Sequence, residues 1–237
     1  MTKLSVNINK LATLRNSRGK NNPDVQVWAE VIESYGVHGI TVHPRPDERH
    51  IRYRDVELLK PVVRGEFNIE GYPDEKWMDL VTEVKPHQAT LVPDPPGALT
   101  SNAGFDVTAS HAFLEKMIGR LKRETPNTRI SVFIEPGRFS SAEAAALRSL
   151  GADRIEMYTE KYADDPKTVG EYRQLADLAL GAGLGLNAGH DLTSENLPAL
   201  IRAIPEIDEV SIGHALICDA LSFGMKDTVA RYLKALS

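Results

Sequence analysis

Residues 39–50 read GITVHPRPDERH, and this stretch decides the fold that we predict for the chain. Apolar and polar side chains alternate over its first positions, as they do in a half-buried strand. Pro44 and Pro46 then end the strand and stiffen the following loop, because proline fixes φ and has no backbone N–H. The loop carries Arg45, Arg49 and His50. A strand that runs into such a loop is typical of an anion site at the carboxyl end of a barrel strand.

Seven further stretches repeat this plan, since short strand-like runs alternate with longer helical runs along the chain. The predicted strands are 3–8, 39–42, 66–69, 88–92, 130–134, 154–157, 185–188 and 209–212. The predicted helices are 24–35, 54–63, 74–84, 106–124, 140–150, 166–182, 194–203 and 215–236. We therefore predict an α/β fold, a (β/α)8 TIM barrel with extra helical segments, formed by residues 1–237 as one domain.

Side-chain parity along these strands separates an apolar face, expected under the helices, from a polar face that lines the barrel. The residues expected at the carboxyl ends of the strands on the polar face, or just beyond them, are Asn7, His43, Glu70, Glu156, His190 and His214. A buried charge without a partner is strongly destabilising, so chance placement of the whole set is a poor explanation. The set indicates a functional site at one mouth of the barrel.

The composition argues against several classes of protein. The chain has 237 residues, 42% of them hydrophobic, which is enough for a large core. Its net charge is −5 and its basic residues form no runs, which disfavours binding to nucleic acid or to an anionic membrane. Cys218 is the single cysteine, which fits a reducing compartment. With no signal-peptide pattern and no apolar run of membrane-spanning length, we expect a cytoplasmic protein.

Two Gly-His pairs follow the last two predicted strands, in AGHD (188–191) and IGHA (212–215). Barrels often bind phosphate here, because glycine lets backbone N–H groups approach and a helix N-terminus favours negative charge. The loop with Arg45, Arg49 and His50 is expected to hold a second phosphate, since arginine offers a planar fork of donors. Thr100 and Ser101, in the long connection 93–104, would add hydroxyl donors.

Acid–base chemistry is expected from Glu70, because a partly dehydrated carboxyl group has a raised pKa. His43 and His190 suit the same work, whereas Glu135, which shares the inward parity, is expected to be structural. The histidines lack metal-binding spacings such as H-x-H or H-E-x-x-H, so we expect no metal. No lysine is expected inside the mouth, which disfavours a Schiff base on the protein.

Five blocks of the sequence resemble the pyridoxine 5′-phosphate synthase family, in the same order and over nearly the whole chain. They are VNINKLATLRNSRG (6–19), GITVHPRPDERHI (39–51), FNIEG (67–71), LNAGHDLT (186–193) and SIGHALI (211–217). The resemblance implies a (β/α)8 barrel that assembles into an octamer of paired subunits and needs no cofactor. It implies condensation of 1-deoxy-D-xylulose 5-phosphate with 3-amino-2-oxopropyl phosphate, giving pyridoxine 5′-phosphate, phosphate and water.

The resemblance also implies roles for individual residues. His43 and Glu70 match proton acceptors, His190 matches the proton donor, and Glu156 matches a carboxylate that stabilises the transition state. The residues that match holders of the amino-ketone phosphate are Asn7, Arg18, Gly213 and His214. The residues that match holders of the deoxyxylulose phosphate are Arg45, His50 and Thr100.

Three positions depart from the usual pattern of this family. Asn9 and Lys10 stand where an Asp-His pair is usual, which makes them possible substrate-binding residues, and Asp191 stands where glycine follows the histidine. We expect Asp191 to contribute its backbone N–H. These departures leave a non-catalytic homologue that binds a phosphate ligand as an alternative. An isomerase or aldolase-type barrel acting on one phosphosugar is another.

Overall fold

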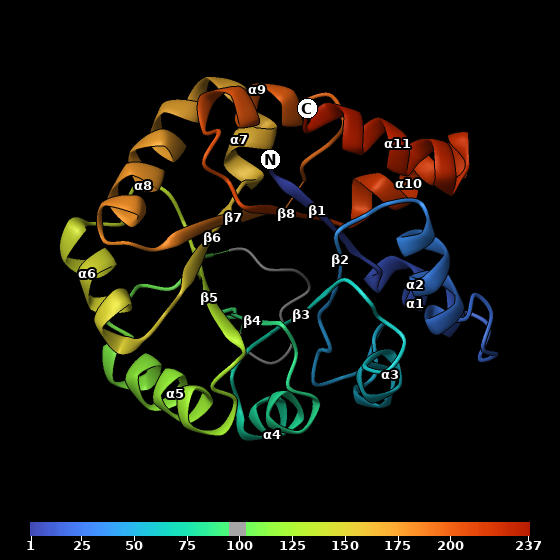
Figure 1. The fold of residues 1–237 in the computed structure, drawn as a ribbon, viewed down its shortest axis with the longest axis horizontal. Coiled ribbons are helices and arrows are strands. Elements are labelled where there is room, and N and C mark those ends of the chain that lie inside the picture. The colour runs from blue at the N-terminus through green and yellow to red at the C-terminus, as the bar shows by residue number, and fades with distance from the viewer. Residues whose placement is uncertain (95–102) are drawn as a thin grey trace.

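The computed structural model describes residues 1–94 and 103–237, and these residues form a closed barrel of eight parallel strands (Figure 1). Each strand pairs with the next one along the chain, and the last pairs with the first. The strands are β1 (Lys3–Asn7), β2 (Gly39–Val42), β3 (Glu66–Gly71), β4 (Gln88–Leu91), β5 (Arg129–Ile134), β6 (Arg154–Tyr158), β7 (Gly185–Gly189) and β8 (Glu209–Ile212). The (β/α)8 prediction is confirmed, and every predicted strand lies within two residues of an observed one.

Helices surround the barrel on its outer face (Figure 1). They are α1 (Asn9–Asn16), α2 (Val25–Ser34), α3 (Tyr53–Leu59), α4 (Glu75–Val84), α5 (His111–Glu124), α6 (Ser141–Leu150), α7 (Glu160–Asp164), the 3-10 helix η1 (Pro166–Thr168), α8 (Val169–Gly181), α9 (Leu197–Ala203), α10 (His214–Phe223) and α11 (Met225–Ala235). Local capping explains several of their ends. Asp74 caps α4 by accepting from the Trp77 N–H at 2.8 Å, and Ser140 and Glu143 form a capping box on α6. Gly151 ends α6 with φ at +100°.

The structure corrects several helix predictions. The predicted helices included none in 9–23, yet α1 lies there and contains Lys10. The N-cap residue of α1 is Ile8, whose apolar side chain makes no capping hydrogen bond, so the usual start signal was missing. Gly224, at φ +79°, divides the predicted helix 215–236 into α10 and α11. The predicted helix 106–124 begins only at His111.

A short helix that precedes the predicted helix 166–182 was also missed. Residues 160–164 form α7, and the predicted helix 166–182 starts as η1 before it continues as α8. The sequence around Asp164, Asp165 and Pro166 favours a break, since proline cannot continue a helix that precedes it. The extra helical segments are therefore α1, α7 and the second of the two helices, α11, that replace the predicted helix 215–236.

The predicted parity of the strands is confirmed. Leu4, Val6, Ile40 and Val42 are fully buried in the main apolar core between strands and helices. Inside the barrel, a chain of hydrogen bonds links small polar side chains on neighbouring strands. It runs from Ser5 to Thr41, Asn68 and Thr90. Polar side chains therefore fill a lumen that in most barrels is packed with branched aliphatic residues.

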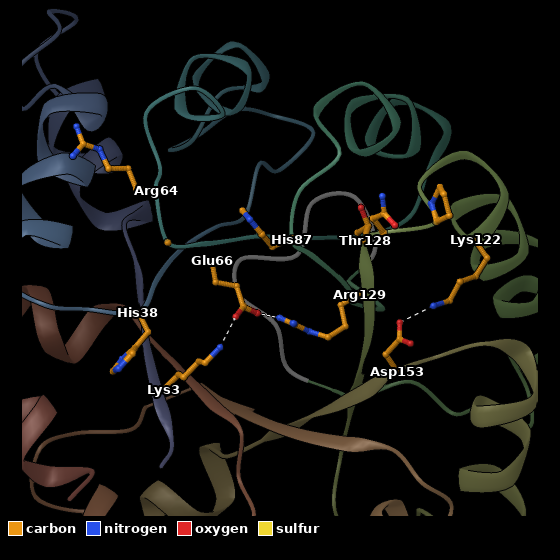
Figure 2. Close-up of a pocket in the computed structure, with 12 residues that line it drawn as sticks. Lys3, His38, Arg64, Glu66, His87, Lys122, Thr128, Arg129 and Asp153 are labelled. Carbon is orange, nitrogen blue, oxygen red and sulfur yellow. Dashed lines mark hydrogen bonds and ion pairs between the residues drawn. The ribbon is translucent and has the colours of Figure 1, made fainter.

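Charged side chains close the amino-terminal mouth of the barrel (Figure 2). Glu66 lies between Lys3 and Arg129 and makes an ion pair with each of them, the first at 3.3 Å. Lys122 pairs with Asp153 at 2.7 Å on the rim of the same mouth. These pairs surround a cavity of about 440 Å³. The mouth predicted to be functional lies at the opposite, carboxyl end of the strands.

Candidate active site

A cavity of about 580 Å³ opens at the carboxyl-terminal mouth, where the predicted residues were expected. Residues from β1, α1, β3, β6 and β8, from the start of α10 and from the loops after β2 and β7 line it. The predicted site residues among them are Asn7, Asn9, Lys10, His43, Arg45, His50, Glu70, Glu156, His190, Asp191, Gly213 and His214. Residues far apart in the sequence thus share one opening, and two predicted residues, Arg18 and Thr100, remain to be placed.

Glu70 is buried on the inner face of β3, with each oxygen of its carboxyl group beside a different residue. The Ser211 hydroxyl donates to Oε1 at 3.3 Å, and the His43 Nδ1 lies 3.7 Å from Oε2. The backbone is fixed as well, because the Trp77 indole N–H donates to the Glu70 carbonyl at 3.1 Å. Burial raises the pKa of Glu70 to about 8, against the opposing effects of Ser211 and Arg45. A carboxyl group with this pKa can exchange protons near neutral pH.

Glu156, on β6, is almost fully buried and faces the same lumen. Its Oε2 has no hydrogen-bond partner among the described residues. Burial and then the nearby charge of Glu70 raise the pKa of Glu156 well above its usual range. Gly189, on β7, makes room for it, since a Cβ at that position would collide with Glu156 Oε1. Ionising both carboxyl groups in one dry lumen costs free energy, because the two negative charges repel and neither is hydrated. The pair therefore tends to hold a proton.

His43 is buried at the end of β2, and burial lowers the pKa of its imidazole well below the usual value, with Arg45 and His50 adding to the effect. The imidazole is therefore neutral near pH 7 and able to accept a proton. Asn9 holds the backbone here, because its Oδ1 accepts from the His43 N–H at 3.0 Å. The Asn9 N–H in turn donates to Asn7 Oδ1 at 3.0 Å. The first turn of α1 thus positions His43.

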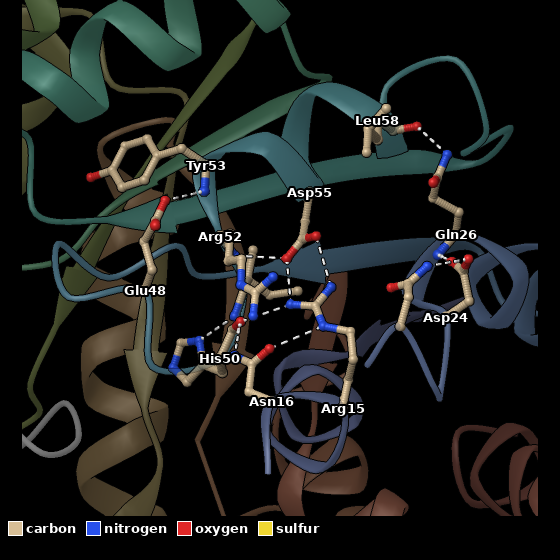
Figure 3. A network of polar contacts seen from close by, with 12 residues as sticks. Arg15, Asn16, Asp24, Gln26, Glu48, His50, Arg52, Tyr53, Asp55 and Leu58 are labelled. Atoms are coloured by element: carbon tan, nitrogen blue, oxygen red, sulfur yellow. Dashed lines mark hydrogen bonds and ion pairs between the residues drawn. The ribbon is translucent and has the colours of Figure 1, made fainter. Parts of the chain in front are cut away.

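The loop after β2 is held from two sides. Arg45 donates to Asp94 at 2.8 Å, and both side chains are buried. On the other side, Arg15 of α1 makes a two-pronged ion pair with Asp55 of α3, at 2.7 and 2.8 Å, and also donates to the His50 carbonyl (Figure 3). This network was not predicted from the sequence, because α1 was not predicted. The loop is fixed before any ligand arrives.

His50 is presented to the cavity in a neutral form. Its Nδ1 accepts from the Ile51 N–H at 2.9 Å, which leaves the Nε2 hydrogen to donate. Burial, followed by the charges of Arg45 and Lys10, lowers the pKa of His50 to about 4. Arg49 also lines the cavity, and its side chain is paired with the exposed Asp47. This end of the cavity is rich in donors suited to an anion.

His190 lies in a turn that differs from the predicted one. His190 and Asp191 have φ values of +67° and +51°, which few residues other than glycine adopt. Thr159 holds the turn, since its hydroxyl donates to the carbonyls of Gly189 and His190. The predicted helix N-terminus is absent at this point, because α9 begins only at Leu197. A helix therefore offers no stabilisation to an anion beside AGHD.

Two aromatic rings hold the His190 imidazole edge-on. The ring centroids of Phe133 and Tyr158 lie 5.0 and 5.3 Å from that of His190. Phe133, Tyr158 and Val92 form a small apolar cluster inside the mouth. Burial lowers the pKa of His190, although Asp191 opposes this effect. Neither aromatic residue was predicted to be part of the site, because inward parity along the strand was the only signal in the sequence.

The second Gly-His pair lies as predicted at a helix N-terminus. Gly213 is the N-cap residue of α10, and His214 is the first residue of that helix. Gly213 packs against Asn7, where an added Cβ would lie 3.1 Å from the Asn7 Cβ. Backbone N–H groups at the start of α10 are available for an anion because no side chain caps them.

The last two predicted residues differ from the rest. Arg18 is exposed in the turn after α1 and does not line the cavity. Thr100, like Ser101, lies outside the described residues. Glu135, expected to be structural, is exposed at the end of β5. The structure also adds residues that the sequence did not single out, namely Arg15, Asp55, Asp94, Phe133, Tyr158 and Ser211.

In residues 1–94 and 103–237, no group of three or more His, Cys, Asp or Glu side chains is placed to hold a metal ion. No helix in the same two ranges is long and apolar enough to cross a membrane.

The fold and the site together define a (β/α)8-barrel enzyme of the kind that works on phosphorylated small molecules. The family described as "Pyridoxal phosphate biosynthesis protein PdxJ" matches residues 4–237. The chain belongs to this family.

Relatives of known name agree with this membership. Pyridoxine 5′-phosphate synthase of Parabacteroides distasonis is 51% identical over 242 residues, covering 100% of both chains. The enzyme of the same name from Cytophaga hutchinsonii is 51% identical over 241 residues, covering 100% of this chain and 99% of its own.

Solved structures with a similar fold have much lower identity. KGPDC from Streptococcus mutans has a TM-score of 0.67 at 11% identity, covering 100% of this chain and 97% of its own. A 3-hexulose-6-phosphate synthase has a TM-score of 0.66 at 13% identity, covering 100% of both chains. These two likenesses concern the fold alone.

Proposed function

We propose that this chain is a pyridoxine 5′-phosphate synthase, which condenses 1-deoxy-D-xylulose 5-phosphate with 3-amino-2-oxopropyl phosphate. The observation that carries the proposal is the composition of one cavity. Glu70, whose pKa is about 8, shares it with neutral His43 and with two groups of anion donors. One group is Arg45 and His50, and the other is the start of α10. Two anion sites beside an acid–base centre suit a reaction between two phosphates.

The chemistry requires repeated proton transfers between bound substrates. The amine of one substrate attacks the ketone of the other, and loss of water gives an imine between the two substrates. Phosphate then leaves, water adds, and ring closure with dehydration gives the product. Holding both substrates in one cavity makes the condensation effectively unimolecular. A positioned acid or base contributes about 10²- to 10⁴-fold to each step that it serves.

We assign the catalytic roles as follows. Glu70 and His43 accept protons. Burial keeps the His43 imidazole neutral and able to accept a proton, and it raises the pKa of Glu70 to about 8, which makes the ionised carboxylate a stronger base. His190 donates a proton, and Glu156 stabilises the transition state. The resemblance to the family supplies these roles, and the shared cavity supports them.

The substrate-binding roles follow the same division. We assign Asn7, Gly213, His214 and the Asp191 N–H to the amino-ketone phosphate, and Arg45 and His50 to the deoxyxylulose phosphate. Asn9 and Lys10 are further candidates, since both line the cavity. Arg18 and Thr100 keep their proposed roles from the family resemblance alone.

The test is incubation of purified protein with both substrates, followed by detection of pyridoxine 5′-phosphate by absorbance and mass. We expect product and one inorganic phosphate only when both substrates are present. Conversion of either phosphate alone would support an isomerase or aldolase instead. Binding of both without any conversion would support a non-catalytic homologue.

We also propose that residues 1–237 act as one domain, in the cytoplasm, without a cofactor, and as a homo-oligomer. The family resemblance implies an octamer. Large apolar side chains exposed on α1 and α10 support association, since Leu14 is 55% exposed and Leu221 is 81% exposed. Sedimentation equilibrium tests the number of subunits.

A further inference from the structure

Ser211 makes a hydrogen bond across the barrel. It lies on β8, whose neighbours in the sheet are β7 and β1, whereas Glu70 lies on β3. The Ser211 hydroxyl nonetheless donates to Glu70 Oε1, at 3.3 Å. The hydrogen bonds among Ser5, Thr41, Asn68 and Thr90 join adjacent strands instead. Ser211 thus links two strands that are not neighbours in the sheet, at the level of the candidate catalytic carboxyl group.

The hydrogen bond from Ser211 engages only one of the two oxygens of the Glu70 carboxyl group. Oε1 faces Ser211, and Oε2 lies 3.7 Å from His43 Nδ1. The backbone of Glu70 is separately fixed by Trp77, so the remaining freedom lies in the side-chain torsions. A hydrogen bond to one oxygen restrains those torsions and directs the other oxygen. At 3.3 Å the bond is long for an O–H donor, and such bonds in free enzymes often shorten when substrate binds.

We infer that Ser211 is a positioning residue for Glu70, acting through one carboxyl oxygen while the other accepts a proton from substrate. This inference rests on the proposed function and concerns a residue to which no role was assigned. Ser211 lines the cavity but is buried, so its hydroxyl is turned to the carboxyl group rather than to solvent.

Other groups also act on Glu70 and must be distinguished from Ser211. His43 and Arg45 lie on the loop after β2, and Asp94 lies after β4. Glu156 faces it from β6 and Glu209 from β8. Among these groups Arg45 favours the ionised form of Glu70, while Asp94, Glu156 and Glu209 oppose it. Ser211 favours the ionised form without adding a charge, so its removal changes one interaction only.

Ser131 offers a matched control. It occupies an inward position on β5, is fully buried, and its hydroxyl has no hydrogen-bond partner among the described residues. Ser131→Ala therefore deletes the same atom from the same lumen without touching Glu70. Ser211→Thr keeps the hydroxyl, and Ser211→Ala removes it.

The experiment measures kcat and KM for both substrates from about pH 6 to pH 10 in the wild type and these three variants. In Ser211→Ala we expect the limb of the kcat–pH profile that follows ionisation of Glu70 to move by about one pH unit to higher pH. At pH 7 we expect kcat to fall about tenfold, with each KM within about twofold of the wild type. Ser211→Thr and Ser131→Ala should follow the wild type.

Three outcomes would overturn the inference. One is a Ser211→Ala profile that coincides with the Ser131→Ala profile. Another is a raised KM with an unmoved limb, since the hydroxyl would then bind substrate directly. The third is a lower Tm with unchanged pH dependence, which would indicate a structural role alone.

A measurement that needs no turnover keeps the inference separate from the proposed function. Carbon-13 NMR can follow the glutamate carboxyl groups during a pH titration, with Glu70 identified by the signal that Glu70→Gln lacks. We expect the Glu70 pKa to be higher in Ser211→Ala than in the wild type. An inactive wild-type protein would contradict the proposed function, whereas an unmoved Glu70 titration would contradict the role of Ser211.

Discussion

The guanidinium of Arg45 donates to the carboxylate of Asp94 at 2.8 Å, and both side chains are buried beside the candidate active site. Removing one partner of such a pair leaves the other charge uncompensated, which costs more than the pair itself is worth. Asp94 thus fixes the direction of a residue proposed to hold phosphate. Because Arg45 reaches its partner before substrate arrives, little side-chain entropy remains to be lost on binding.

Asp94→Asn should weaken binding of the deoxyxylulose phosphate, because Arg45 loses its charged partner. We expect its KM to rise about tenfold and the free energy of unfolding to fall by about 1–3 kcal/mol. Steady-state kinetics and urea denaturation measure the two effects. Asp47→Asn is the control, since Asp47 pairs with Arg49 at an exposed site on the same loop. Equal effects of the two variants would contradict this account.

Glu70→Gln should abolish turnover and change the pH dependence of stability. Burial raises the pKa of Glu70 to about 8, so the folded state binds a proton that the unfolded state releases above about pH 4.5. The associated stability is present at low pH and is lost as the pH rises through 8. Glutamine cannot ionise, so the Tm of Glu70→Gln relative to the wild type should increase from pH 6 to pH 9. A constant difference in Tm would argue against a raised pKa.

Gly189→Ala should inactivate the protein, because the added Cβ collides with Glu156 Oε1. We expect at least a hundredfold loss of kcat together with a lower Tm, since a well-packed lumen tolerates added volume poorly. Gly181→Ala is the matched control, as a Cβ there meets open space on helix α8. That change should leave activity intact and raise stability by about 0.5–1 kcal/mol. An active Gly189→Ala protein would exclude a close approach of β7 to Glu156.

Phe133→Leu should lower kcat more than it changes KM, because one of the two rings that hold His190 is lost. An aromatic pair contributes about 0.5–1.5 kcal/mol beyond its buried area, so we expect a three- to tenfold effect on kcat. Phe113→Leu is the control, since Phe113 stacks on Tyr72 away from the cavity. If Phe113→Leu lowered kcat as much, the effect would be one of general stability.

Arg15→Lys should loosen the loop that presents His50, because lysine cannot make the two-pronged pair with Asp55. We expect a KM for the deoxyxylulose phosphate about fivefold higher, with the unfolding free energy lower by about 1–3 kcal/mol. Arg120→Lys changes a similar arginine in an exposed network of α4 and α5. Because exposed pairs contribute about 0–1 kcal/mol, that variant should be nearly neutral.

The sequence determined the strands and the polar and titratable side chains at their carboxyl ends. Alternation of polar and apolar residues along Gly39–His43 is a local property, and it fixes which face of a strand is buried. Eight such strands have few ways to bury their apolar faces, so Asn7, Glu70 and His190 were correctly predicted to share one mouth. The pair Gly213 and His214 was also predictable, since a strand leads directly into a helix there.

The tertiary structure alone decided which residues hold the chemical groups in place. The N-cap residue of α1 is the apolar Ile8, so the usual capping signal was missing for the helix that brings Arg15 to Asp55. The turn at His190 depends on Thr159, which is 31 residues away in the sequence. Ser211 and Glu70 are separated by 141 residues and meet only because the barrel closes. Contacts of this kind depend on distances across the lumen, which the order of residues along the chain does not contain.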